Sequence, residues 1–260
     1  MPCTICYFCQ MSQLKIAVIG NGNAGSFFKQ ALDIHQIKVK TFARNPAKHE
    51  KSMESLVEKI SDYDMIILAV NDSAIKTVSA MLPTSSALYV HCSGGLDMGQ
   101  IDDKHKRRGV FYPLMSLKGK LKIDPKSIPF CLEAETDEDM DFMADLIHRL
   151  GATYYAVDSE KRAHLHIAAV LAQNFTNHLY HLAKTTLQEV ELDFKILTPL
   201  IENSVKKLAS KEPEKLQTGP AIRRDEVTIQ KHLDLIKDPV TKDIYKLLTQ
   251  SIQQTHDEKL

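Results

Sequence analysis

The chain has 260 residues, of which 43% are hydrophobic and 25% are charged, a composition typical of a globular protein rather than a disordered or collagen-like one. Lys plus Arg and Asp plus Glu are each 33, so no net charge attracts nucleic acid or an anionic membrane. No window reaches the roughly 18 consecutive apolar residues of a membrane-spanning helix. We therefore expect no nucleic-acid partner and no membrane partner.

Residues 1–11 differ in composition from the rest of the chain. Cys3, Cys6 and Cys9 stand three residues apart, a spacing that suits thiolate ligands of zinc or of an iron–sulfur cluster. No fourth cysteine or histidine lies nearby, so we interpret residues 1–11 as a frayed tail and predict no metal site. The segment also lacks the basic start and apolar stretch of a secretory signal, which predicts a cytoplasmic protein.

A strand and a glycine-rich turn open the first predicted domain, residues 12–157. Apart from Lys15, residues 14–19 are apolar and rich in β-branched side chains, which indicates a buried parallel strand, and residues 26–32 have helical composition. In such a unit the first glycine permits a tight turn, the second lets the backbone approach a pyrophosphate, and the third lets the helix pack closely. The amides at the helix N-terminus would then hold the phosphates. The predicted dinucleotide-binding turn is Gly20-Asn21-Gly22-Asn23-Ala24-Gly25.

The next predicted strand, residues 38–42, ends just before Arg44 and Asn45. An NAD site usually carries Asp or Glu at such a strand end, where the carboxylate binds the ribose hydroxyls. No acid stands in this exit, whereas the guanidinium of Arg44 matches a 2′-phosphate. Arg44 and Asn45 therefore favour NADP over NAD. The alternative for Arg44 is a solvated turn residue.

Strands and helices continue to alternate up to residue 157. Further strands are predicted at 65–70, 87–91, 109–112, 129–133 and 153–157, and helices at 50–60, 73–81 and 137–150. This alternation predicts an α/β fold with a Rossmann-type doubly wound parallel sheet. Ligands bind at the carboxyl ends of the strands in such sheets, so Val70, Asn71, His91 and Ser93 join the predicted cofactor site.

Beyond residue 158 helical spacing replaces the strand signals and predicts an all-helical domain over 158–260. Residues 159–190 contain neither Gly nor Pro, which predicts one long helix, and its apolar residues on more than one face indicate burial between neighbours. Shorter helices are expected at 199–209, 226–236 and 239–256. Asp225 and Asp238 are the expected N-caps of the last two.

Two polar residues of the long helix are candidate catalytic groups. His166, Val170 and Asn174 step by four residues and fall within an arc of about 80°. His166 could donate a proton to a substrate as hydride arrives, and Asn174 could orient that substrate. The alternative is that both are satisfied structural side chains. His178 and His181 on the same helix supply too few ligands for a metal.

The segment Thr218-Gly219-Pro220 is predicted to form a turn between two helices. Thr218 is the third candidate catalytic residue. Arg223 or Arg224 could clamp a carboxylate or phosphate of the substrate. In the structural alternative, Asp225 caps the following helix while one of the arginines forms an ion pair.

Several of these motifs together resemble a known family. The glycine turn and segments 43–46, 68–71 and 91–94 look like the NADP-binding half of pyrroline-5-carboxylate reductase. More specific segments resemble Rossmann-like oxidoreductases whose helical C-terminal domain, of unknown function, is similar to that of 6-phosphogluconate dehydrogenase. These segments are Phe111-Tyr112-Pro113-Leu114, His166-Ile167-Ala168-Ala169 with Asn174, and Thr218-Gly219-Pro220 with Arg224-Asp225 and His232. The resemblance implies NADP binding and a homodimer formed through the helical domain.

Our leading hypothesis is an NADPH-dependent reductase of a small carbonyl or imine compound. Two departures from the related families qualify it. Hydroxyacid dehydrogenases of this plan carry a catalytic Lys where this chain has Val170, and the Gly of the family's Arg-Gly-Asp run is replaced by Arg224. The missing Lys favours an alternative, a non-catalytic NADP-binding sensor or scaffold acting through its helical dimer. A phosphate-transfer enzyme is disfavoured because no Gly-Lys-Ser/Thr ending follows the glycine turn.

Overall fold

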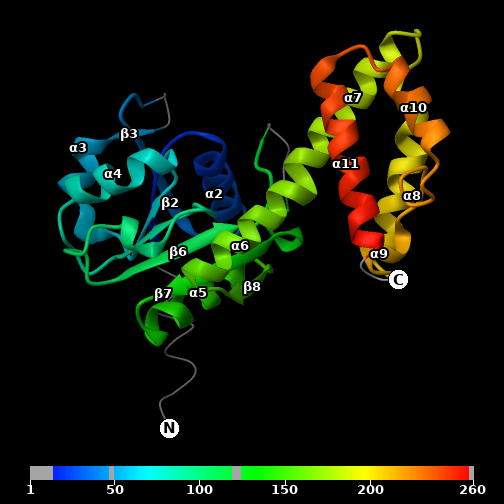
Figure 1. The fold of residues 1–260 in the computed structure, drawn as a ribbon. Coiled ribbons are helices and arrows are strands. Elements are labelled where there is room, and N and C mark those ends of the chain that lie inside the picture. Colours follow the sequence, from blue (N-terminus) through cyan, green and yellow to red (C-terminus); the bar gives the residue numbers. More distant parts are fainter. Residues whose placement is uncertain (1–13, 47–49, 119–123, 258–260) are drawn as a thin grey trace. The chain divides into compact units, whose positions relative to one another are not determined.

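The chain forms two compact units, the first ending at Val170 and the second beginning at Leu171. They are seen in a computed structural model that describes residues 14–46, 50–118 and 124–257 (Figure 1). The first unit contains residues 159–169, which the sequence pattern assigns to the helical domain; the domain limits 12–157 and 158–260 stay predictions. The predicted tail, with its three cysteines, lies outside the described residues.

The first unit is built on one eight-stranded sheet with the order β3-β2-β1-β4-β5-β6-β7-β8. Strand order reverses between β1 and β4, which creates the switch point where ligands bind in open α/β sheets. The strands are β1 (Lys15–Ile19), β2 (Lys38–Ala43), β3 (Lys51–Ser52), β4 (Met65–Leu68), β5 (Leu88–His91), β6 (Arg108–Pro113), β7 (Pro129–Ala134) and β8 (Thr153–Ala156).

One strand pair departs from the predicted parallel sheet. β7 pairs antiparallel with β6, while every other neighbouring pair is parallel. A parallel pair needs a crossover connection, usually a helix. Between β6 and β7, the described residues contain only the 3-10 turn η5 (Pro125–Ser127), so the chain turns back at the same edge.

Helices cover both faces of the sheet, which confirms the doubly wound arrangement (Figure 1). Successive strand residues point to opposite faces: Val18 of β1 packs into one apolar cluster and Ile19 into the other. The helices are α2 (Asn23–Ile34) and α5 (Asp137–Arg149) on the Val18 face, and α3 (Met53–Val57), η2 (Ile60–Asp62) and α4 (Ile75–Met81) on the Ile19 face. The short turns η3 (Asp72–Ala74) and η4 (Met98–Gln100) follow β4 and β5.

The predicted long helix is interrupted where the two units meet in the sequence. α6 (Ser159–Ala169) is followed by the π-helix η6 (Val170–Phe175) and then by α7 (Thr176–Gln188). Without Gly or Pro the segment stays helical, but its hydrogen bonding shifts to the wider π pattern. This pattern is rare in proteins and, where it occurs, is often found at functional sites. Composition alone does not signal this change.

Two helices of the second unit are capped as expected. Asp225 accepts a hydrogen bond from the Thr228 amide at 3.0 Å, and Asp238 accepts one from the Thr241 amide at 2.7 Å. Both predicted N-caps are thereby confirmed. The elements after α7 are η7 (Phe194–Leu197), α8 (Thr198–Leu208), α9 (Pro213–Leu216), α10 (Glu226–Leu235) and α11 (Pro239–Asp257). No helix among the described residues is both long and apolar enough to cross a membrane.

Burial in the second unit differs from the expectation. α7 has no buried residue, and Leu171, Phe175 and Leu179 are 57%, 57% and 38% exposed. In this single chain α7 is therefore not buried between neighbours as predicted. The apolar residues are present, but no segment described in this single chain covers them.

Candidate functional site

The three glycines of the turn after β1 differ in what surrounds them. Gly20 has a φ of 118°, and a Cβ there would overlap the carbonyl oxygen of Ala69. A Cβ on Gly25 would overlap the carbonyl oxygen of Gly20, whereas a Cβ on Gly22 would have no atom within 4 Å. Gly20 and Gly25 thus serve the fold, while Gly22 leaves open space beside the backbone.

The amino end of α2 offers hydrogen-bond donors at this open space. α2 begins at Asn23 with Gly22 as its N-cap, and no side chain caps it. The first amides of a helix have no partner within it and carry the positive end of its dipole. Asn23 and Ala24 supply the first of these amides, so the turn fits an anionic diphosphate.

The exit of β2 brings an acid that the sequence analysis missed. Arg44 and Asn45 are exposed, and Arg44 forms no ion pair within the described part of the chain. The carboxylate of Glu50 accepts a hydrogen bond from the Asn21 side chain at 3.1 Å. Glu50 lies beyond the predicted strand exit in sequence, so no local sequence pattern predicts its contact with the glycine turn.

The turns after β4 and β5 are joined by a side-chain hydrogen bond. Val70 is half-buried and Asn71 is exposed at the end of β4, beside the glycine turn because Gly20 packs on Ala69. Ser93 Oγ donates to the Asp72 carboxylate at 2.8 Å. The predicted residues of both strand ends therefore lie at one edge of the sheet, and Asp72 adds a charge that the sequence analysis did not select.

His91 is fully buried and holds the β5 turn. Its Nδ1 accepts the Ser93 amide hydrogen at 3.2 Å, and its Nε2 lies 3.1 Å from the Asp97 carbonyl oxygen. Burial is the main cause that lowers the pKa of His91 to about 4. The ring is therefore neutral near pH 7, with its proton on Nε2, and it positions Ser93 in the turn.

A second cluster gathers around Gly94. A Cβ on Gly94 would lie 2.6 Å from Tyr112 Cζ and 2.8 Å from both Tyr112 Oη and His166 Nδ1. The two rings meet edge to face with centroids 6.3 Å apart. His166 Nδ1 is buried and has no hydrogen-bond partner among the described residues. Tyr112 was quoted only for its motif in the sequence analysis, and its convergence on His166 was not predicted.

A buried ion pair fixes the helix that carries His166. The Arg162 side chain is fully buried and pairs with the Glu133 carboxylate. Arg162 Nη2 also donates to the Leu96 carbonyl oxygen at 2.6 Å, and Ser159 Oγ donates to Glu133 at 2.8 Å. These bonds connect the first turn of α6 to β7 and to the turn after β5. His166 follows Arg162 by four residues, so it extends from a fixed helix start.

The other predicted catalytic residues belong to the second unit. Asn174 lies in the π-helix and Thr218 precedes Gly219, and both side chains are exposed. Their part in a site with His166 stays a prediction. No group of three or more His, Cys, Asp or Glu within the described ranges is arranged to hold a metal ion.

Arg224 stands where the family motif carries a glycine. Its φ is 52°, in the left-handed region that favours glycine, which is the residue the resemblance places there. Its guanidinium pairs with Asp257. The structure thus matches the structural alternative for this segment, in which Asp225 caps the helix and one arginine, Arg224, forms an ion pair. Arg223 and Arg224 are both exposed.

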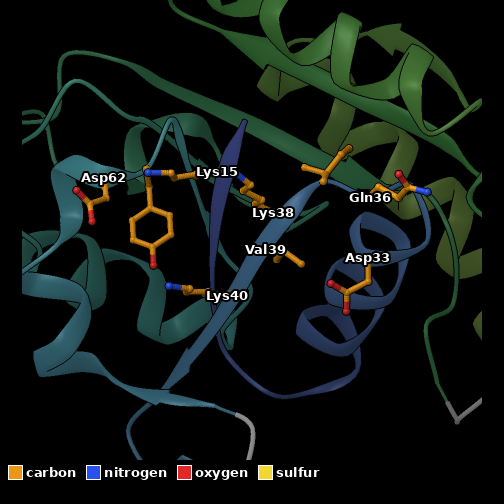
Figure 2. Close-up of a pocket in the computed structure, with 9 residues that line it drawn as sticks. Lys15, Asp33, Gln36, Lys38, Val39, Lys40 and Asp62 are labelled. Carbon is orange, nitrogen blue, oxygen red and sulfur yellow. The ribbon is translucent and has the colours of Figure 1, made fainter. Parts of the chain in front are cut away.

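A pocket of about 450 Å³ lies at the opposite end of the sheet (Figure 2). Lys15 and Lys38, the first residues of β1 and β2, line it together with Lys40, Asp33 and Asp62. Ligands of open α/β sheets bind at the carboxyl ends of the strands, and this pocket is at the amino ends. The pocket is therefore separate from the site around the glycine turn.

Comparison with known proteins agrees with this architecture. A family model described as "Domain of unknown function (DUF2520)" matches residues 128–252. A Bacteroides fragilis protein, provisionally named an NADP oxidoreductase, is 32% identical with a TM-score of 0.84, covering 94% of this chain and 99% of its own. No curated protein matches the sequence.

Two further solved structures share the fold. A Thermotoga maritima protein is 22% identical with a TM-score of 0.69, over 94% of this chain and 99% of its own. An imine reductase from Pseudomonas sp. is 15% identical with a TM-score of 0.70, over 94% of both chains. The helical C-terminal region is thus shared along with the sheet.

Proposed function

The chain belongs to the family of the Bacteroides fragilis protein provisionally named an NADP oxidoreductase, and from this premise we propose that it is an NADPH-dependent reductase of a small carbonyl or imine compound. The observation that carries the proposal is the open space at Gly22 beside the uncapped start of α2. A dinucleotide needs close backbone approach and free amides at this position. Gly20 and Gly25 leave no comparable space.

The chain's own residues bind the coenzyme at the carboxyl edge of the sheet. The amides of Asn23 and Ala24 hold the diphosphate, and Arg44 binds the 2′-phosphate. Val70 and Asn71 would line the nicotinamide side of the site. When bound, NADPH supplies the hydride, and the protein supplies orientation and electrostatics.

The substrate side of the proposal uses three residues. His166 supplies the proton that accompanies the hydride, and its buried, unpartnered Nδ1 supports this role. Asn174 and Thr218 orient the substrate by hydrogen bonding. Val170 stands where related dehydrogenases carry Lys, and its alkyl side chain cannot transfer a proton.

Arg44→Ala is expected to weaken NADPH binding about tenfold to a hundredfold, because a charge-assisted pair with a phosphate contributes about 1.5–3 kcal/mol. Isothermal titration calorimetry with NADPH and NADH measures this. NADH lacks the 2′-phosphate, so its affinity is the internal control and is expected to stay within about twofold. Equal affinities of the wild type for both coenzymes, or an unchanged NADPH affinity in the variant, would refute the assignment.

The second unit supports the proposal of a homodimer. Among its described residues only Ala221 and Ile229 are buried, whereas an independently folded unit needs a hydrophobic core. Leu171 and Phe175 leave more than half of their surface exposed. A second copy presents the same apolar surface, and two-fold symmetry makes such a surface self-complementary. Obligate homodimer interfaces are also the most apolar class.

Phe175→Asp is expected to shift the dimer to monomer and to lower the thermal midpoint of unfolding, because it places a charge in the apolar interface. Sedimentation velocity at several concentrations measures the state. Ile34→Asp is the matched control, because Ile34 is 61% exposed on α2 of the first unit, and it should sediment like the wild type. A monomeric wild type at all concentrations would contradict the dimer.

A further inference from the structure

We propose that Tyr112 is the catalytic residue that hands the proton to the substrate, and that His166 restores the proton to Tyr112. This inference rests on the proposed reductase function and refines it, because His166 then acts through the phenol. The substrate class is a compound whose carbonyl oxygen or neutral imine nitrogen can accept a hydrogen bond. The inference comes from the side chains that converge on Gly94.

Tyr112 stands at the edge of the sheet where the coenzyme site lies. β5 and β6 are parallel, and His91 is paired with Val110. Counting two residues onward along both strands places Tyr112 level with Ser93. The hydroxyl of Ser93 in turn binds Asp72 after β4. Three adjacent strand ends therefore bring Tyr112 to the turn that faces the predicted nicotinamide position.

Two polar atoms near Gly94 have no partner within the described residues. A side-chain atom on Gly94 would sit 2.8 Å from both Tyr112 Oη and His166 Nδ1. Neither atom forms a hydrogen bond within the described residues, and the nitrogen is buried. Buried polar atoms in native proteins are nearly always paired, and an exception calls for an explanation such as a bound ligand or water molecule or a catalytic role. Convergence of an O–H donor and an imidazole suits a proton relay.

The surroundings keep Tyr112 in its donating form. Burial, the largest cause, raises the pKa of its phenol above the ordinary value, and the nearby Cys131, Asp72 and Cys92 raise it further, while Arg162 lowers it. The raising causes prevail, so the phenol is protonated near neutral pH. Its conjugate phenolate is accordingly a strong base that readily recovers a proton.

The step conserves atoms and electrons. A hydride supplied by NADPH, whose own C–H bond would break to leave NADP+, forms a new C–H bond at the substrate carbon, and the electron pair of the C=O or C=N bond moves to the heteroatom. That atom takes the proton as the Tyr112 O–H bond breaks. The phenolate then regains a proton by relay through the half-buried ring of His166, which takes one from solvent as it gives one up.

Tyr112→Phe is expected to lower kcat at least about a hundredfold, the usual scale of a lost general acid, while the NADPH dissociation constant stays within twofold. His166→Gln is expected to lower kcat less, with partial rescue by added imidazole. Wild-type kcat should fall at high pH as the phenol ionises, and the residual rate of Tyr112→Phe should lack this decline. A panel of carbonyl and imine compounds with loss of NADPH absorbance provides the assay.

A matched pair of glycine variants tests the geometry. Gly94→Ala puts a methyl group 2.8 Å from both Tyr112 Oη and His166 Nδ1 and must displace them, whereas Gly95→Ala places its Cβ 3.5 Å from His166 Cδ2, an ordinary contact. We expect Gly94→Ala to lose kcat at least tenfold and Gly95→Ala to lose less than twofold. Equal losses in both would overturn the assignment.

A binding experiment provides a readout that does not depend on turnover. The difference in phenolate absorbance between wild type and Tyr112→Phe follows the ionisation of Tyr112. Adding NADP+ should move this titration to lower pH, because a positive nicotinamide ring nearby favours the phenolate. No shift at saturating NADP+, or a Tyr112→Phe variant with undiminished kcat, overturns the inference while leaving the reductase standing. A wild type that reduces no member of the panel overturns both proposals.

Discussion

Gly25→Ala is expected to lower the free energy of unfolding by about 3 kcal/mol or more, whereas Gly22→Ala is expected to leave stability within about 1 kcal/mol of the wild type. A methyl group on Gly25 overlaps the carbonyl oxygen of Gly20, and backbone on both sides leaves no flexible group to yield, so the cost reaches the upper range of overpacking. Urea unfolding followed by circular dichroism measures both variants. Gly20→Ala should behave like Gly25→Ala, with the added strain of φ 118°.

The same Gly22→Ala variant is expected to bind NADPH at least tenfold more weakly. Its φ is −74°, a conformation that any residue adopts, and the added methyl group meets no protein atom within 4 Å. The small loss of an N-cap glycine and the small gain from a stiffer unfolded chain nearly offset each other. The methyl group would therefore occupy only the space reserved for the diphosphate. A stable variant with unchanged NADPH affinity would show that the coenzyme lies elsewhere.

The sequence predicted the sheet well because local signals and tertiary packing agree there. Residues 16–19 of β1 are apolar without a break and buried, as in a strand covered on both faces. The glycine turn was predictable for the same reason, since Gly20 and Gly25 each occupy a position where a Cβ would overlap the backbone. The reversal of β7 was not, because strand direction depends on the connection and not on the composition of the strand.

The site around Gly94 illustrates what local patterns do not contain. Gly94, Tyr112 and His166 come from three elements separated by at least eighteen residues, and only packing shows that a Cβ on the glycine would touch both side chains. Glu50 reaches Asn21 in the same nonlocal way. The helical spacing did select His166, but no periodicity distinguishes a buried imidazole nitrogen without a partner from a satisfied one.

The predicted burial of the helical segment that includes α7 failed for a different reason. The apolar content of residues 159–190 predicted burial, yet Phe175 of η6, next to α7, is 57% exposed in the single chain. A pattern records that a face is apolar, and it does not record which chain covers that face. The homodimer proposal rests on this difference.

Glu133→Ala is expected to destabilise the first unit by about 3–5 kcal/mol, the cost of leaving a buried charge without its partner. The Arg162 side chain has no solvent exposure, while that of Glu133 is 16% exposed, so the guanidinium cannot regain water without moving α6. Lys161→Ala is the control, because its pair with Asp158 joins side chains that are 77% and 51% exposed and should contribute little to stability. Chemical unfolding of both variants gives the comparison.

The double variant Glu133→Leu with Arg162→Met separates charge pairing from positioning. Replacing both charges by apolar side chains of similar size removes the uncompensated charge, so much of the lost stability should return. The Arg162 bonds to the Leu96 carbonyl oxygen and to Ser159 would still be missing, and with them the connection between α6 and the turn that holds Gly94. We therefore expect a stable double variant whose kcat remains low, because His166 is no longer held against Tyr112. Recovery of both stability and kcat would show that Arg162 contributes to folding alone.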